Sequence, residues 1–266
     1  MGLLIARYAL EDGTHFGILD GSVLKRLAGV PFDSLAESGH RDPLNAVKLL
    51  APIAQPRIFG LGYNYKAHSQ EVGKNVPEAP VLFMKPSTSA IGPDDAIVYP
   101  RHGEVIHYEG ELTAVIGRRA RHVREEHALD YVFGYTCGND VSDRVLQRQE
   151  SAFGCLLAGK GYDTFAPIGP FIATGLDPAN QRVITRVNGV VRQDGNSRDL
   201  VFPVAYLVAY LSKYMTLLPG DLIMTGTPAG VGPIQVGDTV EVDIPGIGVL
   251  RNPVVAEHDV PGVGAG

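Results

Sequence analysis

Short apolar runs rich in β-branched residues, separated by turns that contain glycine or proline, recur along most of the chain. Runs of this length and composition are typical of β-strands. Asn188-Gly189 joins two of them and favours a type I′ hairpin turn, because asparagine and glycine tolerate its positive φ angles. After residue 56 the pattern predicts strands at Arg57–Gly62, Val81–Lys85, Ala96–Tyr99, His107–Gly117, Tyr131–Asn139, Val183–Val187, Val190–Gln193, Asp221–Thr225, Thr239–Ile244 and Gly248–Val255.

Only a few segments have a helical pattern. Pro203–Tyr214 is the strongest of them, and its proline lies near the first turn, where proline is well tolerated. Ser142–Glu150 is predicted as a short amphipathic helix capped by Ser142 or Asp140. The polar segment Asn64–Gly73 fits either a short helix or a mobile loop. Strands dominate and do not alternate regularly with helices, so the pattern predicts a β-dominated α+β fold and not a doubly wound sheet.

The first 55 residues have a pattern of their own. Short apolar runs alternate there with turns such as Glu11-Asp12-Gly13, which predicts a small β-rich N-terminal unit with one helix near Leu44–Leu50. Pro52 and Pro56 indicate a linker, after which residues 56–256 form the main domain. The last residues, 257–266, are predicted to be a flexible tail.

The composition fits one large domain with a small appendage, since 45% of the 266 residues are hydrophobic and 20% are charged. The net charge is −6, and the basic run from Arg118 to His122 is too short for a nucleic-acid footprint. The most apolar window, Val201–Leu211, contains Pro203 and is too short to span a bilayer. We therefore expect neither a nucleic-acid partner nor a membrane segment.

The cysteines and the N-terminus predict a soluble cytoplasmic protein. Cys137 and Cys155 form neither a C-x-x-C pair nor a disulfide framework, so we expect two buried, reduced thiols. The stretch from Met1 to Tyr8 lacks an apolar region long enough for a signal peptide.

Three carboxylates carry the strongest chemical signal in the chain. Glu109 and Glu111 lie two residues apart in a predicted strand and therefore share a face, with Cα atoms roughly 6.5–7 Å apart at ~3.3 Å per residue. Asp140 ends a second predicted strand. If the two strands are neighbours, three oxygen donors converge, and such a set favours Mg²⁺ or Mn²⁺ over Zn²⁺ or Cu²⁺, with Ca²⁺ also compatible. Glu-x-Glu pairs on strands also commonly face solvent or pair with lysine and arginine.

A second signal lies in the segment from Asn64 to about Pro77. His68 and Glu71 occupy positions i and i+3, so in a helix Glu71 can accept a hydrogen bond from the imidazole. That is the arrangement of a general base and the group that orients it, although a solvated surface pair has the same spacing. Because the segment is polar and lacks an apolar face that would anchor it, we predict a lid that orders over bound substrate.

Three further polar side chains complete the candidate site. Lys160 lies between two glycines, where a ligand can approach the backbone closely, and it can bind a substrate oxygen. Arg144 and Gln147 occupy positions i and i+3 of the predicted helix after Asp140, where Arg144 can neutralise a substrate carboxylate. Each of these residues can equally be an ordinary surface residue.

An ordered set of short motifs runs from residue 57 to about residue 254. The motifs are Gly62–Tyr65 with His68 and Glu71, Pro80–Pro86, Tyr108–Leu112, Gly134-Tyr135, Asn139–Arg144, Gly159–Phe165, Pro167–Pro170, Val187–Gly189, Pro219–Asp221 and Thr225–Pro228. Each motif is weak alone, but the ordered set is specific, and it resembles the fumarylacetoacetate hydrolase family. Residues 1–55 look like the small N-terminal unit that many bacterial members carry.

The resemblance implies a mixed β-roll for residues 56–256, usually assembled as a homodimer, with one Mg²⁺ or Mn²⁺ in each subunit. By this similarity the metal ligands are Glu109, Glu111 and Asp140. The chain departs from a common family pattern just before Lys160, where many members have a tryptophan and this chain has Cys155-Leu156-Leu157.

The resemblance also implies catalytic roles and an activity. His68 and Glu71 match the family's lid dyad, which orients and deprotonates water. Other positions match residues that contact the 2-oxo acid end of the substrate or the developing oxyanion: Arg144, Gln147, Lys160 and Thr227. The leading prediction is a metal-dependent hydrolase that cleaves a carbon–carbon bond in a 2,4-dioxo acid resembling an acylpyruvate, in the catabolism of aromatic compounds or sugars. An isomerase or decarboxylase of a 2-oxo or 2-hydroxy-diene dicarboxylate, or a non-enzymatic metal-dependent binding protein, are the alternatives.

Overall fold

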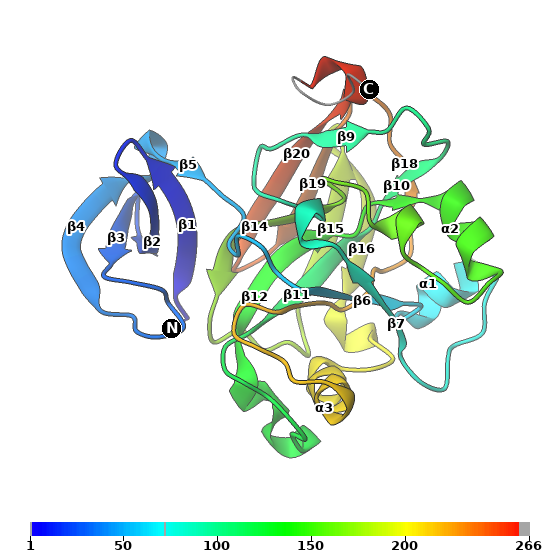
Figure 1. Ribbon diagram of the computed structural model, residues 1–266, viewed down its shortest axis with the longest axis horizontal. Helices are drawn as coiled ribbons and strands as arrows, with labels where there is room; N and C mark the ends of the chain where they lie inside the picture. Colours follow the sequence, from blue (N-terminus) through cyan, green and yellow to red (C-terminus); the bar gives the residue numbers. More distant parts are fainter. Residues whose placement is uncertain (1, 72, 261–266) are drawn as a thin grey trace.

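The computed structural model describes residues 2–71 and 73–260 (Figure 1). Within these residues, three sheets of twelve, five and three strands carry most of the chain. This mixed, strand-dominated arrangement confirms the β-dominated α+β prediction. The strands are β1 Leu4–Leu10, β2 Gly13–Asp20, β3 Val23–Leu27, β4 Glu37–Pro43, β5 Lys48–Leu49, β6 Ile58–Gly62, β7 Val81–Lys85, β8 Ala90–Ile91, β9 Ile97–Tyr99, β10 Ile106–Tyr108, β11 Gly110–Ile116, β12 Val132–Asn139, β13 Ser142–Asp143, β14 Ala166–Ala173, β15 Arg182–Val187, β16 Val190–Asn196, β17 Leu222–Met224, β18 Gly232–Pro233, β19 Thr239–Ile244 and β20 Gly248–Ala256.

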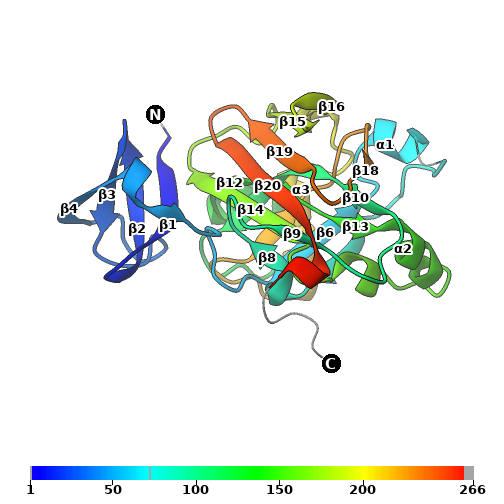
Figure 2. The ribbon, with the colours of Figure 1, turned by 90° about the horizontal axis from the view of Figure 1, so that it is seen from above.

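The first five strands form a meander that stands to one side of the molecule (Figures 1 and 2). Strands β1 to β4 pair antiparallel in the order β4-β3-β2-β1, and β5 pairs with β1. Strand β1 also pairs with β14 through Leu4 opposite Ala173 and Ile5 opposite Ile172. The meander is therefore a continuation of the large sheet.

The helix predicted near Leu44–Leu50 is wrong. The structure has only a three-residue 3₁₀ turn there, Leu44–Ala46, which the two-residue strand β5 follows. Lys48 and Leu49 pair with Ala9 and Tyr8 of β1. Strand pairing has therefore replaced the intrahelical hydrogen bonds that the prediction required.

The large sheet continues through β14, β12, β11, β17, β6 and β7, with β17 and β6 parallel and the other neighbours antiparallel. The five-stranded sheet, in the order β16-β15-β19-β20-β9, packs against β11 and β12. Leu112 and Ala114 of β11 belong to the hydrophobic cluster shared with that sheet, whereas Val115 belongs to a cluster on the opposite face. Because both faces of β11 are covered, every residue of this strand is buried, and side chains near its start are rigidly placed.

Three α-helices and several 3₁₀ helices complete the described structure. They are α1 Lys66–Glu71, α2 Arg144–Ser151, α3 Val204–Tyr214, η1 Leu44–Ala46, η2 Ser87–Ser89, η3 Glu125–Tyr131, η4 Ala158–Lys160, η5 Ser197–Asp199 and η6 Glu257–Asp259. Helix α3 confirms the prediction for Pro203–Tyr214, with Pro203 as its N-cap residue. Within the described residues, no helix is long and apolar enough to cross a membrane.

Helix α2 begins later than predicted. Its N-cap is Asp143, whose carboxylate accepts hydrogen bonds from the backbone N–H groups of Val145 and Leu146 at 3.0 and 3.2 Å. The predicted caps, Ser142 and Asp140, are therefore wrong. Ser142 and Asp143 form the short strand β13 against β10, so the chain is still extended at these residues.

The structure also bears on the predicted hairpin turn, the two cysteines and the C-terminal tail. Asn188 and Gly189 have φ angles of 52° and 77°, so they form the predicted hairpin turn between β15 and β16. Cys137 is buried as expected, but Cys155 is exposed, and both thiols are free. The predicted tail at 257–266 begins with the 3₁₀ helix η6, and residues 261–266 lie outside the described residues.

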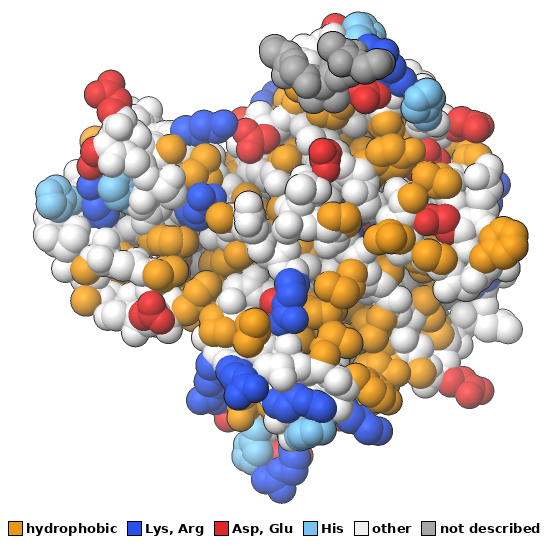
Figure 3. Space-filling view, in the orientation of Figure 1, with side chains coloured by type: hydrophobic (Ala, Val, Ile, Leu, Met, Phe, Trp, Pro, Cys, Tyr) orange, Lys and Arg blue, Asp and Glu red, His pale blue; other side chains and the backbone are white. Residues whose placement is uncertain are grey.

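Charged side chains are unevenly distributed over the surface. On the face shown in Figure 3, lysine and arginine gather over α3 and the neighbouring segment 117–131. Acidic residues interrupt this group, because Arg118 pairs with Asp130 and Arg124 pairs with Glu126. The basic run noted in the sequence is therefore part of a surface of mixed charge.

Candidate active site

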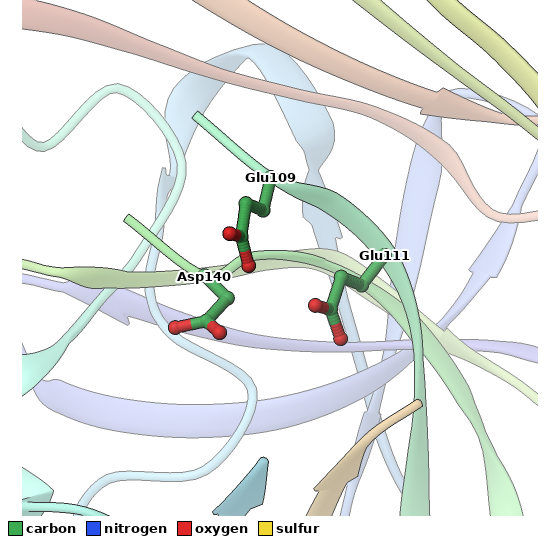
Figure 4. A group of neighbouring side chains, drawn as sticks. All are labelled: Glu109, Glu111 and Asp140. Atoms are coloured by element: carbon green, nitrogen blue, oxygen red, sulfur yellow. The ribbon is translucent and has the colours of Figure 1, made fainter. Parts of the chain in front are cut away.

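The three carboxylates singled out in the sequence come together in the structure (Figure 4). Glu109 lies between β10 and β11, Glu111 is the second residue of β11, and Asp140 directly follows β12. Strands β11 and β12 pair antiparallel with Glu111 opposite Gly138, which brings the start of one strand beside the end of the other. Carboxylate oxygens from all three residues lie within 4.8 Å of one another, and the three side chains are buried.

Glu109 does not lie on a continuous strand with Glu111, which corrects the single predicted strand His107–Gly117. The N–H group of Glu109 donates to the side-chain Oδ1 of Asn139 at 2.9 Å, and its carbonyl accepts from the N–H group of Asp140 at 2.9 Å. A side chain thus replaces one ladder partner, and β10 turns away to pair with β13 and β18. The carboxylates still converge, because Asp140 is hydrogen-bonded to the backbone at this break.

Three cationic groups contact the carboxylate cluster. The Nζ of Lys160 lies 2.8 Å from Glu109 Oε2 and 2.5 Å from Asp140 Oδ2. The Nζ of Lys85 pairs with Asp140 and donates to the carbonyl of Val141 at 3.0 Å. The guanidinium of Arg144 lies 2.5 Å from Glu109 Oε1. Glu109 and Asp140 are therefore compensated by cations from three separate segments.

Glu111 is compensated less completely. Its Oε2 accepts a hydrogen bond of 2.7 Å from the N–H group of Gly226, but its Oε1 is buried without a hydrogen-bond partner among the described residues. Gly226 has a φ of 98°, and a Cβ there would lie 2.8 Å from the Cβ of Asn64, so glycine is needed for this approach. An unpaired buried carboxylate oxygen beside two other carboxylates fits a divalent cation that prefers oxygen ligands.

The pKa values of these groups follow from burial and from their neighbours. Burial, reinforced by the charges of Asp140 and Glu109, raises the pKa of Glu111 well above its usual value. Burial would also raise the pKa of Glu109, but Arg144 and Lys160 outweigh it and hold that pKa below its usual value. Burial lowers the pKa of Lys85, whereas Asp140 and Glu109 outweigh burial and raise the pKa of Lys160. Without a bound cation, Glu111 thus favours its protonated form more than Glu109 does.

A cavity of about 420 Å³ opens beside the cluster. Most of the predicted catalytic and substrate-binding side chains line it, and Glu109 is the carboxylate of the cluster that reaches its wall. The predicted residues in the wall are His68, Glu109, Arg144, Gln147, Lys160 and Thr227. The cavity is thus lined by residues that lie far apart in the sequence, on α1, α2, η4 and two loops.

The His68–Glu71 pair is present on α1. His68 is buried, and its Nδ1 lies 3.1 Å from Glu71 Oε2, while Glu71 Oε1 accepts a hydrogen bond of 2.9 Å from the N–H group of Gly230. The expectation that this segment lacks an apolar anchor is wrong, because Tyr65 is only 2% exposed. Asn64 adds hydrogen bonds to Phe202 and Thr225. The anchors hold the start of the segment, whereas residues 73–76 are exposed.

Gln147 and Thr227 make protein contacts that limit what they offer a substrate. The Oε1 of Gln147 accepts a hydrogen bond of 2.8 Å from Arg144, which holds the two side chains together on α2. The hydroxyl of Thr227 donates to the carbonyl of Gly110 at 2.9 Å and accepts from Gln193 Nε2 at 2.7 Å. Thr227 therefore ties its loop to the residue between the two glutamates.

The family assignment rests on comparison with known proteins. The family model of the fumarylacetoacetate (FAA) hydrolase C-terminal region matches residues 57–255, and the model Rv2993c-like, N-terminal, matches residues 4–52. The chain belongs to the fumarylacetoacetate hydrolase family. This confirms the resemblance that the ordered motifs indicated.

Two family relatives match over most of the chain. Protein Rv2993c of Mycobacterium tuberculosis is 44% identical over 261 residues, which cover 94% of this chain and 97% of the relative. The human mitochondrial oxaloacetate tautomerase FAHD2A is 38% identical over 224 residues, which cover 80% of this chain and 71% of the relative.

Two solved structures of the family extend the comparison. A 5-carboxymethyl-2-hydroxymuconate delta-isomerase from Mycobacterium smegmatis matches with a TM-score of 0.88 and 45% identity, over 95% of this chain and 99% of that one. A fumarylpyruvate hydrolase from Pseudomonas aeruginosa, in complex with Mn²⁺ and pyruvate, matches with a TM-score of 0.73 and 35% identity, over 78% of this chain and 91% of that one. The family thus includes hydrolases, isomerases and tautomerases, and one member binds Mn²⁺.

Several residues of this family site were not predicted as site residues. Lys85 ends a predicted apolar strand, and a lone lysine at the end of Val81–Lys85 was the signal for a buried charge. His107 lines the cavity, and burial lowers its pKa to about 4, so it is neutral at pH 7. Asn139 and Gln193 act through hydrogen bonds to the backbone of Glu109 and Gly110, and no sequence pattern indicates such contacts.

Proposed function

We propose that this protein is a Mg²⁺- or Mn²⁺-dependent hydrolase that cleaves a carbon–carbon bond in a 2,4-dioxo acid resembling an acylpyruvate. The observation that carries the proposal is a buried carboxylate cluster at a cavity whose wall also holds His68, oriented by Glu71. The fumarylpyruvate hydrolase with Mn²⁺ and pyruvate supports it, because pyruvate is the product that such a cleavage releases.

The carboxylates of Glu109, Glu111 and Asp140 would hold the metal. When bound, Mg²⁺ or Mn²⁺ supplies Lewis-acid polarisation of the substrate carbonyl and stabilises enolate charge. Lys160 and Arg144, which pair with Glu109 and line the cavity, would face the substrate. Arg144 would pair with the carboxylate of the 2-oxo acid, with Gln147 holding the guanidinium.

His68 would act as the general base. Glu71 accepts a hydrogen bond from Nδ1–H, which leaves Nε2 free to take a proton from water. Water then adds to the C4 carbonyl, and Lys160 donates a hydrogen bond to the resulting oxyanion. The C3–C4 bond breaks with its electron pair left on the pyruvate fragment, which takes up a proton at C3, while the acyl fragment leaves as a carboxylic acid.

A second candidate is an isomerase, tautomerase or decarboxylase of a 2-oxo or 2-hydroxy-diene dicarboxylate. The isomerase at 45% identity and the tautomerase at 38% favour it. The same base can move a proton between carbon and oxygen without adding water, so His68, Lys160 and Arg144 keep their places in this reaction. Hydrolysis uses water to break the C3–C4 bond, isomerisation and tautomerisation only move a proton, and decarboxylation breaks the bond to a carboxylate and releases CO₂.

The deciding experiment is to supply an acylpyruvate to the metal-loaded protein while following diketone absorbance and free pyruvate together. Hydrolysis removes the absorbance and releases one pyruvate for each substrate, whereas isomerisation or tautomerisation changes the absorbance without releasing pyruvate. His68→Ala should lower kcat about 10²- to 10⁴-fold without changing metal affinity, because His68 is a base and not a ligand. If no 2-oxo acid is turned over although oxalate binds tightly, the protein is a binder and the proposal is wrong.

A further inference from the structure

His107 is the middle residue of β10, the central strand of the three-stranded sheet. It pairs with Ser142 of β13 on one side and with Pro233 of β18 on the other. A strand that is paired along both edges holds its backbone firmly. The position from which the imidazole extends is therefore well defined.

The imidazole extends toward the active-site cavity. Val105, His107 and Glu109 are alternate residues of one segment and all line the cavity. Ile106 and Tyr108 lie between them and are buried in a hydrophobic cluster on the other side. His107 therefore lies next to Glu109 in the cavity wall, beside the carboxylate cluster.

The side chain of Arg144 passes the same place. Its backbone N–H group donates to the carbonyl of Val105 at 2.9 Å, while its guanidinium lies 2.5 Å from Glu109 Oε1. The side chain thus reaches from one end of this short segment to the other, and His107 lies midway between the two ends. The imidazole and the guanidinium are neighbours in the cavity wall.

The two ring nitrogens of His107 have different surroundings. Nδ1 is buried and has no hydrogen-bond partner among the described residues. Nε2 has no partner there either, but it is not buried, so it is the nitrogen that a ligand in the cavity can reach. A proton on Nδ1 would be a buried donor without an acceptor, which is rarer in proteins than an acceptor without a donor. The geometry therefore favours a single proton, on Nε2.

This arrangement is the reverse of that of His68. Nδ1 of His68 lies 3.1 Å from Glu71 Oε2, so the carboxylate holds a proton on Nδ1 and leaves Nε2 as an acceptor. His107 has no carboxylate at Nδ1 within the described part of the chain. Of the two imidazoles that line the cavity, His68 is thus suited to accept a proton and His107 to donate a hydrogen bond.

We propose that His107 is a substrate-binding residue, whose Nε2–H group donates a hydrogen bond to the carboxylate that Arg144 holds. The inference rests on the proposed function, in which Arg144 pairs with the carboxylate of the 2-oxo acid. Two nitrogens of the Arg144 guanidinium already contact Gln147 and Glu109. A carboxylate has about four acceptor sites and so has room for a further donor. His107 supplies that donor without adding a charge beside Arg144.

Nuclear magnetic resonance of the Mg²⁺-loaded protein with ¹⁵N-labelled histidine tests the protonation state at pH 7. The His107 signals are those that disappear in His107→Gln. We expect a protonated Nε2 and an unprotonated Nδ1, and we expect pyruvate to move the Nε2–H proton signal to lower field as the hydrogen bond forms. A proton on Nδ1, or an Nε2–H signal that saturating pyruvate leaves unchanged, would overturn the inference.

Calorimetry with Mg²⁺ and pyruvate tests the role in binding. His107→Asn should weaken pyruvate binding at least about tenfold, as is typical for loss of a hydrogen bond to a charged group. Its shorter amide reaches only as far as Nδ1 does. The amide nitrogen of His107→Gln can take the place of Nε2, so this variant should bind pyruvate within about threefold of the parent. Both variants should bind Mg²⁺ as the parent does, which also shows that they are folded.

His102→Asn makes the same substitution at an exposed histidine outside the cavity and should leave both affinities unchanged. Equal weakening of pyruvate binding by His107→Asn and His107→Gln, or no weakening by either, would overturn the inference while the proposed function stands. A parallel loss of Mg²⁺ affinity would show that His107 acts through Glu109, and would overturn it as well. Failure of the unsubstituted Mg²⁺-loaded protein to bind pyruvate would overturn the proposed function, and the inference with it.

Discussion

Two buried carboxylates, Asp42 in the N-terminal meander and Glu111 in the active site, differ in how many of their oxygens have a hydrogen-bond partner. In the N-terminal meander, Asp42 Oδ2 accepts hydrogen bonds from the hydroxyl of Tyr8 at 2.5 Å and from Arg26 Nε at 2.9 Å, and Oδ1 accepts from the same guanidinium at 3.0 Å. In the active site, Glu111 is more deeply buried, and one of its oxygens has no hydrogen-bond partner among the described residues.

The difference separates a structural carboxylate from a functional one. A buried carboxylate whose two oxygens are both paired contributes to folding stability, because its hydrogen bonds replace those it made to water. A buried oxygen left unpaired costs folding free energy until a ligand fills its place. The unpaired oxygen of Glu111 therefore destabilises the folded protein, and a bound cation would offset this destabilisation. Both oxygens of Asp42 already have hydrogen-bond partners.

Replacing Glu111 with glutamine gives the largest effect that this comparison predicts. Glu111→Gln should lower kcat/KM by about 10⁴-fold, because a metal contributes several kcal/mol of transition-state stabilisation at about 1.4 kcal/mol for each factor of ten. In chelator, the same variant should unfold at the same or a higher denaturant concentration, since glutamine keeps the acceptor for the Gly226 N–H group and removes an ionisable group whose negative charge is unfavourable beside Glu109 and Asp140. Steady-state kinetics and denaturation curves measure the two effects. Full activity, or clear destabilisation in chelator, would contradict the distinction.

The two buried lysines allow a comparison within the site itself. Both contact Asp140, but Lys160 lines the cavity and Lys85 is not among its lining residues. Lys160→Met should lower kcat about 10²- to 10³-fold, which is the usual effect of removing one oxyanion donor. Lys85→Met should lower kcat less than about tenfold at saturating metal, because it removes a structural partner only. Equal losses of kcat in the two variants would show that Lys160 has no separate contact with the substrate.

The sequence predicted the parts of the site that follow from short-range patterns. Glu109, Glu111 and Asp140 were found because they lie at the ends of predicted strands, although the continuous strand that the prediction assumed breaks at Glu109. Lys85 was missed because its partner, Asp140, lies 55 residues away in the sequence, and only the fold brings them together. Strand β14 was also missed, since Pro167 and Pro170 argue against a strand, yet it pairs with both β1 and β12.

The predicted boundaries of α2 and of the strand around Glu109 were wrong for a related reason. Helix α2 starts at Arg144 and the predicted strand breaks at Glu109, because β10 and β13 pair with each other across the site. That pairing is a tertiary contact between two segments of two and three residues, too short to carry a pattern of their own. The residues that bend the chain toward the cavity are thus the ones that local sequence describes least well.

For Asp42, the comparison predicts an effect on stability and not on catalysis. Asp42→Asn should lower the free energy of unfolding by about 1.5–3 kcal/mol, the usual value for hydrogen bonds to a charged group, and should leave kcat and KM unchanged. The hydrogen bond from Arg26 is the main reason that the pKa of Asp42 is lower in the folded protein. Its stabilisation is therefore present above the unfolded pKa, near pH 4, and is lost as the pH falls through the lower folded pKa.

Denaturation of the parent and the variant between pH 7 and pH 3 checks this assignment. The difference in free energy of unfolding between them should be constant near neutral pH and should shrink below about pH 4. A difference that does not depend on pH would mean that the charge of Asp42 is not what stabilises the meander. A fall in kcat would mean that the meander acts on the active site.

Glu150 shares features with both kinds of carboxylate, and the effect predicted for its replacement is small. Like Asp42 it is fully paired, because Oε1 accepts from Ala158 N–H at 2.6 Å and from Leu157 N–H at 3.3 Å, and Oε2 accepts from Gly159 N–H at 2.8 Å. These three residues lead directly to Lys160, so Glu150 positions a catalytic candidate without touching the cavity contents. Glu150→Ala should lower kcat/KM by about tenfold, the lower end for a residue that orients an active-site group.

If Glu150 had only a structural role, Glu150→Ala would lower the stability of the whole protein without affecting residues 157–159 in particular. The measurement must therefore report on this segment separately. Hydrogen exchange of the amides at 157–159 should quicken in Glu150→Ala, while exchange in α3 stays as in the parent. Glu150→Gln should restore part of both the protection and the activity, because its carbonyl oxygen can still accept one of the hydrogen bonds. Unchanged exchange at 157–159 in the alanine variant would show that the backbone holds Lys160 in place by itself, and Glu150 would then belong with Asp42 as a residue of the fold alone.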